Sequence, residues 1–397
     1  MRQQLIRLSP GFVALALVAG VPSVLASETR VLPPATANAM AQAASPQAIA
    51  DYRRKLQEYQ QARAAFEQDA GAYWNAIADK RRTRNAKRRD RVQITLDDYV
   101  LEQPPVYEGP KRPVNPEPEE EGGRPPRRPL PVVADFIRAA AEQYQFTPQR
   151  PANEVEFKRA YARYARAAGL TPEQAVRVYS FETGGTGSYD VQAGIEHGGK
   201  HAISTAIGYN QLLTTNTVEL LAEQGHEFVR ELAERVAATQ GPARKAMEHK
   251  LAVLKKMVAF TRTVPDDWSA HAKLADTAQG WACHAMTLDI DVGPMLQTHK
   301  LLTSVIFARA KGYNRALTAA ELEMMNLTGD GTGLDMVTMP QATREQVPTT
   351  NFFQRSGYER NPVAIRHNTV AKLLAVTNER MDVNSGKPGA RELAAAF

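Results

Sequence analysis

The sequence predicts an all-α protein in which a long N-terminal helix and a proline-rich linker precede a helical domain. Apolar residues recur at helical spacing from Val132 onward, capping patterns precede several of these stretches, and strand-like alternation is scarce. A chain of 397 residues can hold more than one domain. We expect helices over 132–145, 153–168, 172–182, 216–238, 243–262, 267–286, 293–311, 319–326 and 362–380.

The first 26 residues have the pattern of a secretory signal peptide. Arg2 and Arg7 precede the apolar stretch 12–21, and Val24 and Ala26 occupy the positions that signal peptidase reads. No later stretch reaches about 18 consecutive apolar residues, the length that a membrane-spanning helix needs. We therefore expect an exported protein of the periplasm or cell envelope, without a transmembrane domain in the mature chain. An uncleaved anchor is the alternative.

An Ala/Pro/Ser-rich segment over 27–46, which we expect to be flexible, leads into a long helix predicted over 47–91. Apolar residues recur at heptad spacing along this helix and form a stripe in which Arg63 is the single charged residue. The stripe fits a coiled coil, or docking of an envelope partner or a second copy through 47–79. A helix packed on its own domain is the alternative that Arg63 favours. The apolar members of the stripe are Ile49, Tyr52, Leu56, Tyr59, Phe66, Ala70, Tyr73 and Ile77.

The positive net charge of +6 comes from one short segment. Residues 80–91 hold eight basic side chains and one acidic one, whereas 132–397 holds 29 basic and 28 acidic side chains. Such a segment can attach a protein to an anionic polymer or membrane surface, although a solvated helix end is the interpretation we favour. Nucleic acid is not an expected partner of an exported protein.

The remaining boundaries follow from composition. Residues 102–131 contain ten of the 25 prolines, so we expect a semi-extended linker over 92–131. The helical domain is expected over 132–383 and a flexible tail over 384–397. Cys283 is the single cysteine, which excludes an intrachain disulfide and a cysteine-cluster zinc site. The sequence predicts no cofactor and no metal.

Glu182 is the candidate catalytic residue. The helix that begins at Pro172 ends at Glu182, and two glycines follow Thr183. A carboxyl group in the last turn faces the negative end of the helix dipole, and the apolar neighbours Val178 and Phe181 can remove water from it. Both effects raise its pKa, as a general acid requires near neutral pH. An ordinary surface helix end is the alternative.

Three motifs in order resemble the soluble lytic transglycosylase family, which has a lysozyme-like domain. They are Glu182-Thr-Gly-Gly, then Gly208-Tyr-Asn-Gln-Leu, then a helical segment over 320–326 that ends in Met-Asn. The family carries Glu-Ser-Gly-Gly, Gly-Leu-Met-Gln followed by Ile or Leu, and Ala-Tyr-Asn in the same order. The resemblance covers about residues 155–380. The chain departs from the family at Thr183, Tyr209, Asn210, Met325 and a longer insertion over 214–288.

The resemblance implies cleavage of the β-1,4 bond between N-acetylmuramic acid and N-acetylglucosamine in peptidoglycan. Glu182 would protonate the glycosidic oxygen and then, as a base, activate the muramoyl 6-hydroxyl, which closes a 1,6-anhydro ring. The implied substrate-binding residues are Thr183, Gly208, Tyr209, Asn210, Gln211, Asn326 and Tyr358.

Each of these residues has an implied role. Thr183 would bond the acid or a sugar hydroxyl, and Asn210 and Gln211 would hold N-acetyl or hydroxyl groups. Tyr209 would offer an aromatic face to a sugar ring, and Asn326 would present its amide near the acid. Loop packing is the alternative for Tyr209 and Asn210.

Two other functions remain open. A hydrolytic muramidase would need a second carboxylate to activate water, for which Asp190 and Glu196 are the candidates. A non-catalytic adaptor would bind peptidoglycan and recruit an envelope partner through the long helix. The spacing of His197 and His201 does not predict a metal site, because two glycines between them oppose a regular helix.

Overall fold

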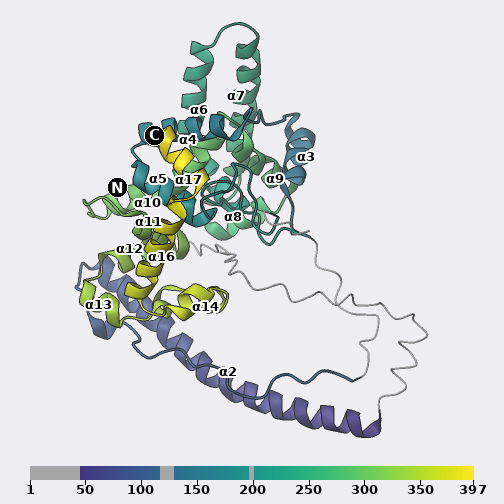
Figure 1. The fold of residues 1–397 in the computed structure, drawn as a ribbon, viewed down its shortest axis with the longest axis vertical. Coiled ribbons are helices and arrows are strands. Elements are labelled where there is room, and N and C mark those ends of the chain that lie inside the picture. Colours follow the sequence, from purple (N-terminus) through teal and green to yellow (C-terminus); the bar gives the residue numbers. More distant parts are fainter. Residues whose placement is uncertain (1–44, 117–128, 196–200) are drawn as a thin grey trace. The chain divides into compact units, whose positions relative to one another are not determined.

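The computed structural model describes residues 45–116, 129–195 and 201–397 (Figure 1). These fall into an N-terminal unit, 45–116, and a helical domain, 129–397. The described residues form helices and no strands, which confirms the all-α prediction. The predicted signal peptide, most of the segment 27–46 and part of the linker lie outside the described residues.

The helical domain has more and shorter helices than predicted. The range 267–286 is divided between α8 and α9, and 362–380 between α15 and α16. The helices are α3 (Val133–Tyr144), α4 (Glu154–Ala168), α5 (Pro172–Glu182), α6 (Thr214–Ala238), α7 (Gly241–Thr261), α8 (Trp268–Ala275), α9 (Ala278–His284), α10 (Gly293–Ala310), α11 (Ala319–Thr328), α12 (Asp330–Thr338), α13 (Gln341–Gln346), α14 (Arg355–Glu359), α15 (Pro362–Arg366), α16 (Val370–Ser385) and α17 (Pro388–Ala396). Short 3₁₀ segments, η2 (Ala285–Leu288) and η3 (Thr349–Phe352), complete this domain.

The C-terminal residues form a packed helix, which differs from the flexible tail expected over 384–397. Helix α17 lies against α4 and α5, and Ala390 and Leu393 are fully buried. The buried ammonium of Lys158 on α4 pairs with Glu392 at 2.5 Å. The backbone N–H of Ala390 donates to the carbonyl of Gly185 at 3.1 Å, so α17 also contacts the turn after α5.

The insertion over 214–288 begins with two long helices, α6 and α7, which run side by side as a hairpin (Figure 1). Gly225 permits the close approach, since a Cβ there would lie 2.5 Å from Val258. Lys250 on α7 anchors the hairpin, because its buried ammonium lies 2.9 Å from the fully buried Asp289 and also pairs with Asp291. The hairpin is therefore fixed through the middle of α7 to the segment that leads into α10.

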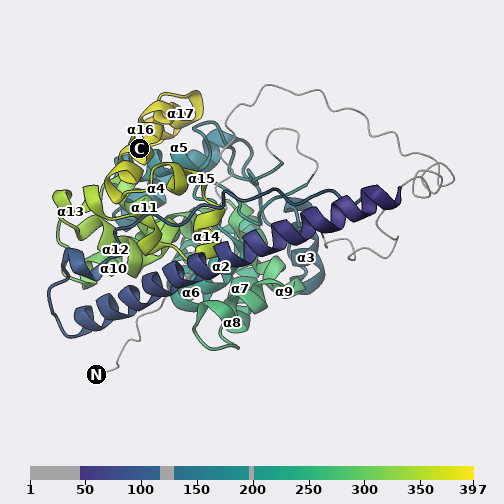
Figure 2. The ribbon, with the colours of Figure 1, turned by 90° about the horizontal axis from the view of Figure 1, so that it is seen from below.

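The N-terminal unit is built on α2 (Pro46–Arg89), a single continuous helix capped by Ser45 (Figure 2). The ring of Tyr107 packs edge-on against Tyr59 and Phe66 of this helix, with centroids 6.2 and 5.4 Å apart. Arg63 lies with its guanidinium 5.1 Å from the Tyr107 ring. The charged interruption of the apolar stripe is thus accommodated by cation–π contact.

The basic end of α2 packs against the chain that follows it. Arg84 is buried, donates to the carbonyl of Asp98 at 2.8 Å and lies over the ring of Tyr99. Lys87 pairs with Asp98 at 2.7 Å, beside the 3₁₀ segment η1 (Leu96–Asp98). The solvated helix end that we favoured is therefore wrong for Arg84 and Lys87. Part of the predicted linker over 92–131 likewise folds back on α2.

Candidate active site

Helix α5 presents Glu182 as its last residue, as the sequence predicts. Thr171 and Gln174 form a capping box at its start, and Pro172 occupies the first turn. The chain leaves the helix through Gly184 and Gly185, which have φ of +66° and +76°. A Cβ at Gly185 would lie 2.2 Å from the carbonyl oxygen of Asn384. Glycine is required here by conformation and by space, and the turn after the acid is fixed against α16.

The structure brings the first and third motifs together. The side-chain amide of Asn326, on α11, donates to Oε1 of Glu182 at 3.1 Å across 144 residues of sequence. Asn326 is buried and Glu182 is half-buried. This contact places an amide beside the predicted acid, as the resemblance implies.

The surroundings of Glu182 favour the protonated carboxyl. Burial raises the pKa of Glu182 well above its ordinary range, and the negative charge of Glu323 raises it further. The ammonium of Lys300 and the hydrogen bond from Asn326 oppose the shift. A carboxyl group held protonated toward neutral pH can donate a proton to a leaving group.

Glu323 is the residue that the sequence analysis missed. It lies on α11 three residues before Asn326, and its side chain is fully buried. Burial raises the pKa of Glu323 to about 8, against the effects of Asn326 and Lys300. The one available signal was its i, i+3 spacing from Asn326, which places the two side chains on one face of the helix.

Lys300, on α10, is the cation of the site. Four carboxyl groups act on it, from α6 (Glu219), α5 (Glu182), α12 (Asp330) and α11 (Glu323). Burial lowers the pKa of Lys300, and these carboxyl groups oppose that shift. Among the described residues, no group of three or more His, Cys, Asp or Glu side chains could hold a metal ion.

Gly208 and Gln211 of the second motif shape a tight turn. Gly208 has φ of +81°, and a Cβ there would lie 2.2 Å from the side-chain amide of Gln297. Gln211 adopts a φ of +44°, and its side chain donates to the carbonyl of Gly208 at 2.8 Å. Both residues therefore stabilise the loop backbone in this structure.

Tyr209 and Asn210, in the same motif, are fully buried. The Tyr209 hydroxyl donates to the carboxylate of Glu154, and its ring lies edge-on to that of Tyr179 at 4.8 Å. The side-chain amide of Asn210 donates to the carbonyl of Gln297 at 2.7 Å. This is what loop packing predicts, and neither side chain presents a surface to a sugar ring.

Thr183 and Tyr358 also make contacts within the protein. The Thr183 hydroxyl donates to the carbonyl of Tyr179 at 2.8 Å, one turn back along α5. Tyr358 is buried on α14, with its ring 6.2 Å from that of Phe353. Neither residue has a described contact with Glu182.

Asp190, one candidate for a second catalytic carboxylate, lies in an ion pair with Arg150 and accepts a hydrogen bond from Ser188 at 2.7 Å. Glu196, the other candidate, lies outside the described residues, as does His197. The carboxyl group that acts on Glu182 is Glu323. The carboxyl group nearest in effect to Glu182 is therefore on α11 and not in the loop that follows Glu182.

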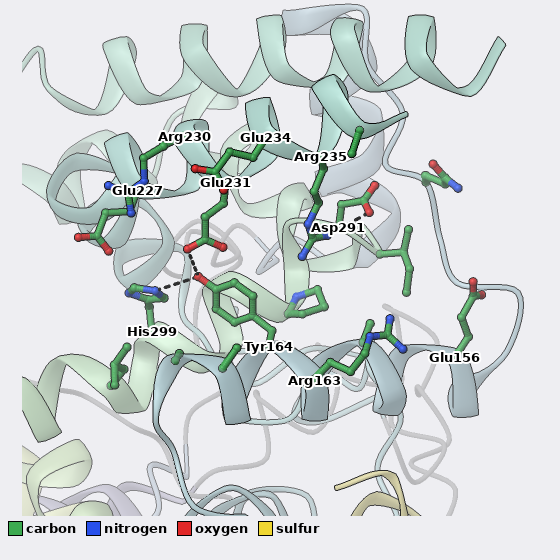
Figure 3. A pocket seen from close by; sticks show the side chains of 18 residues that line it. Glu156, Arg163, Tyr164, Glu227, Arg230, Glu231, Glu234, Arg235, Asp291 and His299 are labelled. Carbon is green, nitrogen blue, oxygen red and sulfur yellow. Dashed lines mark hydrogen bonds and ion pairs between the residues drawn. The ribbon is translucent and has the colours of Figure 1, made fainter. Parts of the chain in front are cut away.

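A cavity of about 1150 Å³ lies between α4, α6 and α10 (Figure 3). Its wall includes Tyr164, whose hydroxyl lies 3.1 Å from Glu231 and 3.2 Å from the ring nitrogen Nε2 of His299. Neither Glu182 nor Asn326 lines this cavity. Since His299 and Lys300 are consecutive on α10, the cavity and the acid site occupy neighbouring faces of that helix.

No protein-family model, curated protein or solved structure matches this chain. Family membership therefore stays a prediction that depends on the three motifs. Within the described residues, no helix combines the length and apolar character needed to span a membrane.

Proposed function

We propose that this protein is an exported peptidoglycan lytic transglycosylase whose helical domain is lysozyme-like. The observation that carries the proposal is the contact between Asn326 and Glu182, which joins two of the three motifs. The raised pKa of Glu182 supports the same role, because the proposed reaction begins with a proton donated by this side chain.

In the proposed reaction, Glu182 protonates the oxygen of the β-1,4 bond, and the bond to the muramoyl C1 breaks. The carboxylate of Glu182 then accepts the proton of the muramoyl 6-hydroxyl, whose oxygen bonds to C1. The products are an N-acetylglucosamine end and a 1,6-anhydromuramoyl end, and no water is consumed. Asn326 holds Glu182 in place through both steps, since its amide can donate to either protonation state.

One observation keeps the adaptor function as a second candidate. Tyr209 and Asn210 of the second motif are fully buried, so the loop offers fewer side chains to a glycan than the resemblance implies. Fewer substrate contacts beside Glu182 weigh against cleavage at this site, whereas an adaptor needs no cleavage site.

The proposal is tested by incubating the full chain with purified peptidoglycan and identifying the products by mass spectrometry. We expect 1,6-anhydromuramoyl ends from the natural protein and none from Glu182→Gln, which keeps the shape of the side chain but removes the proton. Glu173→Gln is the matched control, because Glu173 lies on the same helix and is half-exposed. Reducing ends would indicate a hydrolase, and binding without products would indicate the adaptor.

A further inference from the structure

The cavity between α4, α6 and α10 is separate from Glu182 (Figure 3). Its volume of about 1150 Å³ is enough for a ligand the size of a drug or a short peptide. Its α4 wall carries the small side chains of Ala160, Ala167 and Ala168, which leave space for the side chains of a ligand. The charged residues around this space indicate what kind of ligand it suits.

A directed chain of hydrogen bonds ends at Glu231 in the wall of the cavity (Figure 3). The Tyr164 hydroxyl donates to Oε1 of Glu231 at 3.1 Å, so its oxygen accepts from Nε2 of His299 at 3.2 Å. Burial lowers the pKa of His299 to about 4, which keeps the imidazole neutral with its one proton on Nε2. Both donors are more than nine-tenths buried. The carboxylate of Glu231 is therefore held in position by groups that the fold encloses.

Most other charges around the cavity are offset within the protein. Arg235 pairs with Asp291 at 3.3 Å. Arg230 lies three residues after Glu227 and four residues before Glu234, a spacing that places these side chains next to one another on α6. These five groups are largely balanced without a ligand.

Glu231 and Arg163 are the charged groups that remain for a ligand, since Glu156 accepts a hydrogen bond from the backbone N–H of Ala152. Neither Glu231 nor Arg163 has an ion-pair partner in the part of the chain that the structure describes. A carboxylate can accept about four hydrogen bonds, of which Tyr164 supplies one to Glu231. Arg163 directly precedes Tyr164 on α4 and is exposed, and a guanidinium binds a carboxylate through two parallel hydrogen bonds. One cavity thus offers a place for an ammonium group and a place for a carboxylate.

We propose that this cavity binds a short peptide with free termini, whose ammonium group contacts Glu231 and whose carboxylate contacts Arg163. The alanine side chains of α4 leave room between the two charges for the small side chains of the peptide. The site is independent of Glu182, so the proposal holds whether or not the protein cleaves peptidoglycan.

The proposal is tested by calorimetric titration of the full chain with trialanine, N-acetyl-trialanine and trialanine amide. We expect trialanine to bind, and each blocked peptide to bind at least about tenfold more weakly, because a hydrogen bond to a charged group is lost. Glu231→Gln should abolish the preference for a free amino group and keep the preference for a free carboxylate. Arg163→Met should do the reverse.

Arg159→Met is the matched control, because Arg159 is exposed on α4 and does not line the cavity. This variant should bind all three peptides as the natural protein does, and circular dichroism establishes that each variant is folded. A general loss of structure would not produce opposite preferences in Glu231→Gln and Arg163→Met.

Absence of trialanine binding at millimolar concentration would overturn the proposal. Equal binding of the free and the blocked peptides would overturn it as well, since neither terminus would then be recognised. Selective binding that neither substitution changes would place the peptide at another part of the protein and would also contradict the assignment.

Discussion

At the scale of single residues, Tyr209 shows why a motif does not by itself define a binding surface. Its ring lies among those of Phe157, Tyr161 and Tyr179, and its hydroxyl donates to a half-buried glutamate, Glu154. Burial raises the pKa of Glu154, and the hydrogen bond from Tyr209 opposes that shift. The tyrosine thus stabilises a carboxylate inside the domain.

We predict that Tyr209→Phe lowers the free energy of unfolding by about 1–3 kcal/mol, because it leaves the Glu154 carboxylate without this donor. Cleavage per folded molecule should stay the same. Urea unfolding followed by fluorescence measures the first effect, and initial rates on peptidoglycan measure the second. A variant of natural stability that binds glycan more weakly would contradict the prediction and restore Tyr209 as a sugar contact.

At the level of single residues, the sequence located Glu182 at the end of its helix, where the structure has it, and did not locate its neighbour Glu323; the catalytic role of Glu182 stays a prediction. Glu182 could be found because its helix has a capping box at one end and two glycines at the other. Its contact with Asn326 was implied by the resemblance alone. The i, i+3 spacing from Asn326 was the one signal for Glu323, and it is weak because residues 319–327 of α11 are all buried and no polar face marks which side faces the site.

At the scale of elements, the α6–α7 hairpin carries a cluster of ion pairs around the buried Lys250. Lys250 and Asp289 are both buried, and each has a charged partner within the same cluster. Removing one partner of a buried pair leaves an uncompensated charge. This costs more free energy than the intact pair contributes to stability.

We predict that Lys250→Met lowers the free energy of unfolding by about 3–5 kcal/mol. Lys245→Met on the same helix should change it by less than about 0.5 kcal/mol, because Lys245 is exposed. Thermal unfolding of both variants measures the difference. Equal melting temperatures for the two variants would show that the hairpin is held by apolar packing alone.

Among the helices, those with several turns of apolar periodicity could be predicted from the sequence, and the short ones could not. The long helices α4, α5 and α10 were predicted within one residue of their observed ends, since each carries several turns of apolar periodicity. Helices α12–α15 have five to nine residues, too few for a period to be recognised. The range 267–286 was predicted as one helix because the Thr277 cap between α8 and α9 interrupts the pattern for only two residues.

At the scale of the whole molecule, buried histidines and buried carboxyl groups give opposite pH dependence. Burial lowers the pKa of His284 and of His299 to about 4. The unfolded chain therefore binds more protons than the folded chain between about pH 4 and 6.5, so these histidines reduce stability as the pH falls through this range. Glu323 has a raised folded pKa, so its contribution is present below about pH 4.5 and is lost as the pH rises toward 8.

We predict that Glu323→Gln loses stability more steeply than the natural protein on acidification from about pH 6.5 to 4.5. The variant lacks the stabilising contribution of the Glu323 carboxyl group, which in the natural protein offsets the loss of stability caused by the histidines. One titrating group changes the free energy of unfolding by at most about 1.4 kcal/mol per pH unit. Urea unfolding at several pH values measures both slopes. Parallel pH profiles for the two proteins would mean that Glu323 is already ionised in the folded state.

The packing of α17 on the turn after α5 has a practical consequence for handling the protein. Gly389, in the first turn of α17, leaves no room for a Cβ between the Tyr179 hydroxyl and the Gly185 carbonyl, which would lie 2.6 and 2.9 Å away. The last ten residues thus pack against the turn that follows Glu182 and hold it in place. Proteolytic removal of α17, or an affinity tag that displaces it, should change the position of the Glu182 side chain before the rest of the domain unfolds.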